Sequence, residues 1–209
     1  MKGPSSTPYP GYDVLDKWDT PSFNDQTRDV LRRRLTDVPD RRFFTAAEWP
    51  VLEALCDSVM PQEKGADAVP IPNWIDAALH EGHGSGTRHA DMPAAPDAWR
   101  QGLAALNAEA QLRGASDFAA LDNAGRDAVL HDVDAEKGRA PQWQTLPQRR
   151  FFRNLVLSEI VAIYYSHPTG QSEIGFGGPA SPRGYVRLQA NLADSWEAPP
   201  GDWGGETPR

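Results

Sequence analysis

Three of the five histidines of this chain, His80, His83 and His89, fall within ten residues of sequence. Neutral imidazoles at this density can bind a transition metal. The helical zinc-binding pattern needs two histidines four residues apart on one helix, whereas these are spaced by three and six residues among three glycines. We therefore expect a solvated loop, and a metalloprotein that uses these three histidines is the alternative.

Two further features have the residue types of a functional site but not its context. The stretch from Gly175 to Ala180 fits the G-x-G-x-x-A pattern of dinucleotide-binding turns, but no strand is expected before it, and Pro179 and Pro182 prevent a helix after it. Cys56 is the single cysteine, so the chain can form neither an internal disulfide nor a thiolate cluster. We predict no catalytic, cofactor-binding or metal-binding residue in this chain.

The acidic composition excludes other classes of protein. With 21 Lys and Arg against 29 Asp and Glu, the 209-residue chain carries a formal charge of -8. A uniformly acidic chain is a poor binder of nucleic acid, because phosphate neutralisation dominates that affinity. The most apolar run, residues 160–165, is far shorter than the roughly 20 residues of a membrane-spanning helix, so no direct membrane insertion is expected.

The first 25 residues contain no apolar core of the kind that a secretory signal peptide needs. The arginine run at residues 32–34 is followed by a polar segment, which is unlike a twin-arginine signal. The expected location is therefore cytoplasmic, with the periplasm as the alternative if the chain is exported together with a partner.

Residues 43–165 carry nearly all of the helical periodicity. A capping box of Thr45 and Glu48 opens the first helix of this region, and Pro61 ends it. No useful length of sequence shows the two-residue alternation of a strand. The sequence therefore predicts an all-α protein with a compact helical bundle over residues 43–165. Other helices are expected at residues 25–35, 72–80, 96–112, 123–133 and 147–165.

Two irregular segments that contain aromatic residues flank this bundle. Residues 1–42 form an N-terminal arm with one helix, and residues 166–209 form an extended C-terminal tail in which 14 of 44 residues are Gly or Pro. Apolar tail residues are costly to leave in water, so we expect the tail to pack on the bundle or on a partner. Aromatic and arginine side chains are typical interface residues. The predicted partner interface consists of Tyr164, Tyr165, His167, Ile174, Phe176, Arg183, Tyr185 and Arg187.

Several motifs along the chain match one family in combination rather than singly. They are residues 43–48, 52–61, 99–107, 118–121 and 151–152, and the ending over residues 164–179. Together they resemble the gluconate 2-dehydrogenase subunit 3 family. The resemblance covers about residues 43–188, and its motifs are structural rather than catalytic.

This resemblance implies a non-catalytic small subunit that stabilises a large FAD-dependent dehydrogenase acting on a sugar, glycoside or sugar acid. In that family the large partner is an oxidoreductase of the glucose–methanol–choline type, and a cytochrome c subunit is often a third component. The resemblance thus implies no cofactor in this chain and FAD in the partner subunit, whose folding the small subunit supports. A helical adaptor unrelated to oxidoreductases is the further alternative.

Overall fold

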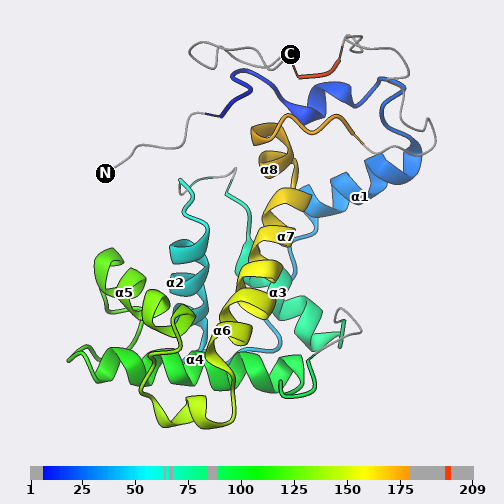
Figure 1. Ribbon diagram of the computed structural model, residues 1–209. Coiled ribbons are helices and arrows are strands. Elements are labelled where there is room, and N and C mark those ends of the chain that lie inside the picture. The colour runs from blue at the N-terminus through cyan, green and yellow to red at the C-terminus, as the bar shows by residue number, and fades with distance from the viewer. Residues whose placement is uncertain (1–6, 64, 66–67, 84–88, 179–195, 199–209) are drawn as a thin grey trace. The chain divides into compact units, whose positions relative to one another are not determined.

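The computed structural model describes residues 7–63, 65, 68–83, 89–178 and 196–198. Throughout these ranges the regular structure is helical and contains no strand (Figure 1), which confirms the all-α prediction. None of the helices in the described ranges combines the length and the apolar character needed to cross a bilayer.

The helices predicted from the sequence are all present, and their ends lie close to the predicted ones. The last of them is one continuous run whose middle part is a wider π-helix, a widening that its residue types did not predict. The predicted helices are α1 (Asp25–Thr36), α2 (Trp49–Val59), α3 (Ile71–His80), α4 (Ala95–Gln111), α5 (Asn123–Asp134) and the run of α6 (Gln148–Arg150), η3 (Phe151–Leu157) and α7 (Ser158–Ser166).

Three short helices were not predicted. Two are 3-10 turns, η1 (Val14–Lys17) and η2 (Pro141–Gln144), and the third is α8 (Pro168–Glu173). The expectation of irregular structure from residue 166 onward is therefore wrong at α8. A proline at the first position of a helix is favourable, because its fixed φ suits the helix and its missing N–H would have no partner there.

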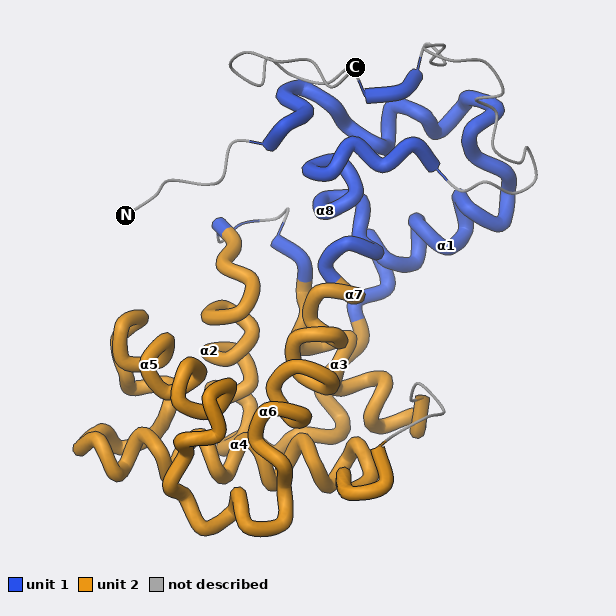
Figure 2. Tube along the Cα trace, viewed as in Figure 1, with its two compact units in different colours: residues 1–38, 63–69, 164–209 blue, residues 39–62, 70–163 orange. Residues whose placement is uncertain are grey.

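The chain divides into two compact units (Figure 2). Unit 1 comprises residues 1–38, 63–69 and 164–209, and unit 2 comprises residues 39–62 and 70–163. The sequence predicts an arm (1–42), a bundle (43–165) and a tail (166–209), with the arm and the tail as separate segments. In the structure they belong to the same unit.

Unit 2 is the helical bundle, in which α2 packs against α3, α4 and α5 (Figure 1). The capping box before α2 is confirmed, since the Thr45 amide donates to Glu48 Oε2 at 2.8 Å and the Glu48 amide donates to Thr45 Oγ1 at 3.3 Å. Buried aromatic rings fill the centre. The Trp99 ring contacts Phe44 and Phe151 edge to face, with centroids 6.3 and 6.1 Å apart.

One glycine of α4 makes room for this aromatic core. A Cβ atom built on Gly102 would overlap Cζ of Phe151, far inside van der Waals contact. Phe151 is buried, and its ring also lies 5.8 Å from that of Trp143. The motif at residues 99–107 therefore contains a glycine at position 102 because the ring of Phe151 packs there.

Two buried carboxylates fix loops of unit 2 to helices. Asp76 of α3 is fully buried and accepts the backbone N–H groups of Arg42, Phe43 and Phe44 at 2.6 to 3.0 Å. Glu109 of α4 does the same for the segment that leads into η2. Both carboxylates satisfy buried amides that would otherwise lack partners, so their role is structural.

Glu159 of α7 provides a pH-dependent term in the stability of unit 2. Its Oε2 accepts from Trp99 Nε1 at 2.9 Å, and burial raises its pKa although this hydrogen bond opposes the rise. A carboxyl whose pKa is raised on folding contributes stability below its unfolded pKa of about 4.3, and this contribution is lost as the pH rises through the folded pKa.

We therefore expect Glu159→Gln to stabilise the protein by about 1 kcal/mol at neutral pH, since the amide oxygen can still accept from Trp99 without carrying a charge. The measurement is urea unfolding of the wild type and the variant at pH 7 and at pH 4. The difference should shrink at the lower pH. A difference that is the same at both pH values would contradict the assignment.

Candidate partner-binding surface

In unit 1 the N-terminal arm and the segment after α7 fold together. Val14, Phe23 and Leu31 form a small buried core, and partly buried apolar side chains that include Trp18 and Phe176 pack against it. The aromatic residues of the arm are thus covered to a large extent by residues of the same unit. The sequence predicts that the tail packs on the bundle or on a partner, whereas Phe176 of its described part packs on the N-terminal arm.

Hydrogen bonds join the same two segments. The carbonyl oxygen of Phe176 accepts from Tyr12 OH at 2.8 Å and from Lys17 Nζ at 2.7 Å. Thr7 Oγ1 donates to the carbonyl oxygen of Glu173 at 2.7 Å, and the Val14 amide donates to Ser172 Oγ at 3.0 Å. Residues 7–17 therefore hold α8 and the turn after it in place.

Lys17 is a buried cation at this junction. Its ammonium lies 5.0 Å from the centroid of the Tyr12 ring, and burial lowers its pKa to about 8, with Glu197 opposing the shift. Because Nζ is already bonded to the Phe176 carbonyl, we assign Lys17 a positioning role for the turn rather than a chemical one.

The glycine-rich sequence after α8 forms a turn, not the opening of a helix. Gly175 has a φ of +61° and Gly178 a φ of +94°, values that favour glycine. A Cβ on Gly175 would also lie 2.7 Å from the Tyr9 ring. The G-x-G-x-x-A pattern is therefore explained, over its described part, by the close approach of the arm.

The predicted interface residues lie in three kinds of environment. Tyr165 and Ile174 are exposed and available to a partner, whereas Phe176 is partly buried. Tyr164 and His167 are buried. The remaining three predicted residues, Arg183, Tyr185 and Arg187, lie outside the described residues.

The two buried members of this set position α8. Tyr164 OH donates to Glu173 Oε1 at 2.6 Å, and burial together with this carboxylate raises the pKa of the phenol. His167 is the N-cap of α8, with Nδ1 accepting from the Thr169 amide at 3.3 Å. Burial lowers the pKa of His167, and Arg34 lowers it further. A neutral imidazole suits its function as a cap acceptor.

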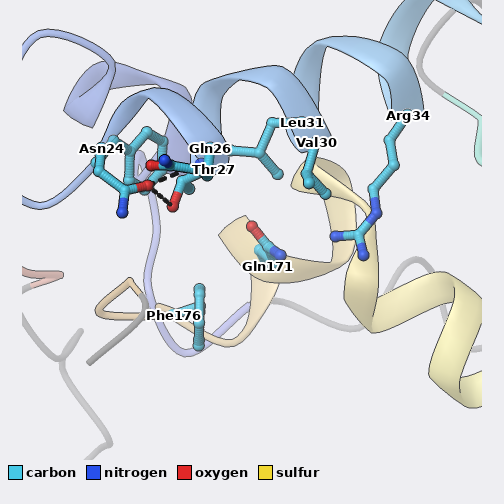
Figure 3. A pocket seen from close by; sticks show the side chains of 9 residues that line it. Asn24, Gln26, Thr27, Val30, Leu31, Arg34, Gln171 and Phe176 are labelled. Atoms are coloured by element: carbon cyan, nitrogen blue, oxygen red, sulfur yellow. Dashed lines mark hydrogen bonds between the residues drawn. The ribbon is translucent and has the colours of Figure 1, made fainter. Parts of the chain in front are cut away.

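A pocket of about 420 Å³ lies between α1 and the segment from Gln171 to Phe176 (Figure 3). Val30, Leu31 and Arg34 extend from α1 toward that segment. The pocket, here called the α1 pocket, is lined by Phe23, Asn24, Gln26, Thr27, Val30, Leu31, Arg34, Gln171 and Phe176.

Sequence reasoning found one of these lining residues, Phe176, and missed the face of α1. The signal was the spacing of Thr27, Leu31 and Arg34, which recur every four or three residues and so share one side of a helix. The sequence analysis predicts a helix at residues 25–35 but assigns no binding role to this face of it.

The histidines of the alternative metal site are in unlike surroundings. His83 Nδ1 lies 3.2 Å from Glu81 Oε2, and His89 Nε2 lies 3.3 Å from Asn154 Nδ2. His80 is exposed at the end of α3. Within the described ranges, no three side chains of the metal-binding types come together.

Comparison with known proteins matches this chain to a protein family. The family model described as gluconate 2-dehydrogenase subunit 3 matches residues 46–178, which is more than half of the chain. No curated protein and no solved structure matches the chain. The matched region contains both the aromatic core around Trp99 and the turn at Gly175.

Proposed function

Because the chain belongs to the gluconate 2-dehydrogenase subunit 3 family, we propose that it is the non-catalytic small subunit of a dehydrogenase complex, in which it stabilises a large FAD-dependent subunit. That large subunit is of the glucose–methanol–choline type and oxidises a sugar, glycoside or sugar acid. The observation that carries this proposal is the family match over residues 46–178.

The chemistry of the described residues supports a scaffolding role. Strongly held polar groups of the described residues, such as the carboxylates of Asp76 and Glu109, bind backbone amides. The family motifs likewise map onto packing positions, as Gly102 and Phe151 show. The reaction then takes place in the partner subunit, which holds the FAD, and the proposal allows for a cytochrome c subunit as a third component.

The test is co-expression with large flavoproteins of the glucose–methanol–choline type from the same genome. This chain carries the tag, and the eluate is examined for a second polypeptide and for the visible absorbance of oxidised flavin. We expect flavin to co-purify in proportion to the large chain, and the large chain to be less abundant in soluble form without its partner. Turnover of a sugar by this chain alone would contradict the proposal.

An exposed apolar residue in each unit allows a second prediction. Ile174, the C-cap residue of α8 in unit 1, is 45% exposed, and Leu112, the C-cap residue of α4 in unit 2, is 54% exposed. We expect Ile174→Asp to raise the dissociation constant of the complex about tenfold, because a buried isoleucine contributes about 1.5–3 kcal/mol. Leu112→Asp is the matched control and should bind as the wild type does.

Both variants are compared by pull-down titration and by circular dichroism. Equal helical content would show that each variant folds. Equal loss of binding in the two variants would place the contact elsewhere than at Ile174.

A further inference from the structure

We propose that the α1 pocket binds a segment of the large subunit in which an apolar side chain lies next to a carboxylate. The apolar side chain contacts Val30 and Phe176, and the carboxylate pairs with Arg34. This inference rests on the proposed function, since it assigns the large subunit as the occupant.

Phe23, Val30, Leu31 and Phe176 give the pocket an apolar part, and the amide of Gln171 also lines it. Phe23 and Leu31 are buried beneath it, whereas Val30 is 42% exposed at its edge. A pocket of about 420 Å³ falls in the range of sites that take a small group or a few side chains. An apolar side chain seated here would remove Val30 and the ring of Phe176 from water.

The two ends of the pocket differ in their capacity to bind. At one end Asn24 Oδ1 accepts from both the amide and the hydroxyl of Thr27 at 2.8 Å (Figure 3). These groups cap α1 and are already satisfied by each other. At the other end lies the guanidinium of Arg34, so a ligand gains most at the apolar part and at this charged end.

Arg34 differs from Arg28 and Arg32, which belong to the same helix and have carboxylate partners. Arg28 and Arg32 pair with Asp25 and Asp29 one turn earlier. Arg34 donates through Nη1 to the carbonyl oxygen of Ser166, and no carboxylate in the described ranges forms an ion pair with it. A guanidinium has five N–H donors, so Arg34 keeps donors for a further acceptor.

Charge complementarity identifies the acceptor as a carboxylate. Arg34 is partly buried, and charge-assisted hydrogen bonds to a guanidinium are stronger than neutral ones. The chain as a whole carries a formal charge of -8, which disfavours the general approach of an acidic partner. A local arginine at the end of an apolar pocket therefore selects one acidic position of the partner rather than an acidic surface.

The decisive variant is Val30→Glu, with Leu35→Glu as its matched control. A glutamate at position 30 lies one turn before Arg34 and can pair with it, which stabilises the helix while it occupies the guanidinium and charges the pocket. Leu35 is also in α1 and is 41% exposed, but it does not line the pocket. Both changes are on the surface, so both variants should fold.

The measurement is the dissociation constant of each full-length variant for the purified large flavoprotein that the wild type binds. We expect Val30→Glu to raise it about tenfold or more and Leu35→Glu to change it less than about threefold. If the wild type binds and Val30→Glu binds equally well, the pocket inference is overturned and the proposed function stands. If the wild type binds no such flavoprotein, the proposed function fails and the pocket inference fails with it.

Two measurements on the variant without its partner identify other occupants. If Val30→Glu makes residues 179–195 more susceptible to limited proteolysis than they are in the wild type, the occupant is the chain's own segment. If the wild type sediments as a dimer and Val30→Glu as a monomer, the occupant is a second copy. Either result would overturn the assignment to the large subunit.

Discussion

Replacing Glu109 by alanine is expected to destabilise the protein by about 3–5 kcal/mol, a large fraction of the stability of an ordinary domain. Glu109 is 1% exposed. Its Oε1 accepts from the Arg139 amide, from the Ala140 amide at 2.6 Å and from Trp143 Nε1 at 3.2 Å, and its Oε2 accepts from Arg113 at 2.8 Å. Removal of the carboxylate leaves buried donors without an acceptor.

Urea unfolding at neutral pH measures this loss, and Asp132→Ala is the control. Asp132 also accepts from Arg113, at 2.5 Å, but its side chain is 42% exposed, against 1% for Glu109. Exposed ion pairs contribute about 0–1 kcal/mol, so the control should lose little. Similar losses in the two variants would show that the buried amides do not depend on Glu109.

The pH dependence separates the charge of Glu109 from its packing. Burial by itself would raise the pKa of Glu109, but hydrogen bonds from Arg113, Ala140 and Arg139 outweigh it and hold the pKa below its usual value. A carboxyl of this kind contributes stability above its unfolded pKa, which is lost as the pH falls through the folded pKa. The difference between the wild type and Glu109→Ala should therefore narrow below about pH 4.

The second large effect is expected from Gly102→Ala. The added Cβ would overlap Cζ of Phe151, whose ring contacts those of Trp99 and Trp143. Phe151 can yield only by displacing other buried rings, so we expect a loss of about 3 kcal/mol, the upper end of the usual cost of overpacking. Thermal unfolding of the two proteins measures it.

A size-compensating change tests the cause of that loss. Phe151→Leu alone should destabilise the protein through the cavity that it leaves. In the double variant the methyl group of alanine partly fills this cavity, so the two losses should sum to more than the loss in the double variant. Strict additivity would mean that Gly102 matters for a reason other than contact with Phe151.

The helices could be predicted because their apolar residues repeat with the period of a helix and because Thr45, Glu48 and Pro61 mark one helix by local chemistry. The packing role of Gly102 could not, since the motif shows a glycine but not the ring that covers it. Glu109 was missed for a related reason. An acidic residue in a helix is ordinarily read as solvated, and its amide partners are some 30 residues away.

The partner interface stays a prediction, and its members differ in how far they are exposed. Sequence reasoning selected Tyr165, Ile174 and Phe176 by residue type, and type alone did not distinguish them from Tyr164 and His167, which are buried. Burial here depends on the pairing of the N-terminal arm with α8, a tertiary contact without a local sequence signal. The α1 pocket follows from the same pairing and was missed with it.

The hydrogen bonds from Tyr12 and Lys17 to the carbonyl of Phe176 span 164 and 159 positions of the chain. During synthesis on the ribosome the arm emerges first. Its hydrogen-bond acceptor, the carbonyl of Phe176, is added only after most of the described residues have been synthesised. Unit 2 is complete by residue 163, so it can fold while the arm still lacks its counterpart. In the nascent chain the Tyr12 hydroxyl therefore lacks its hydrogen bond to Phe176, and the cluster that contains Trp18 lacks the Phe176 ring, during most of elongation.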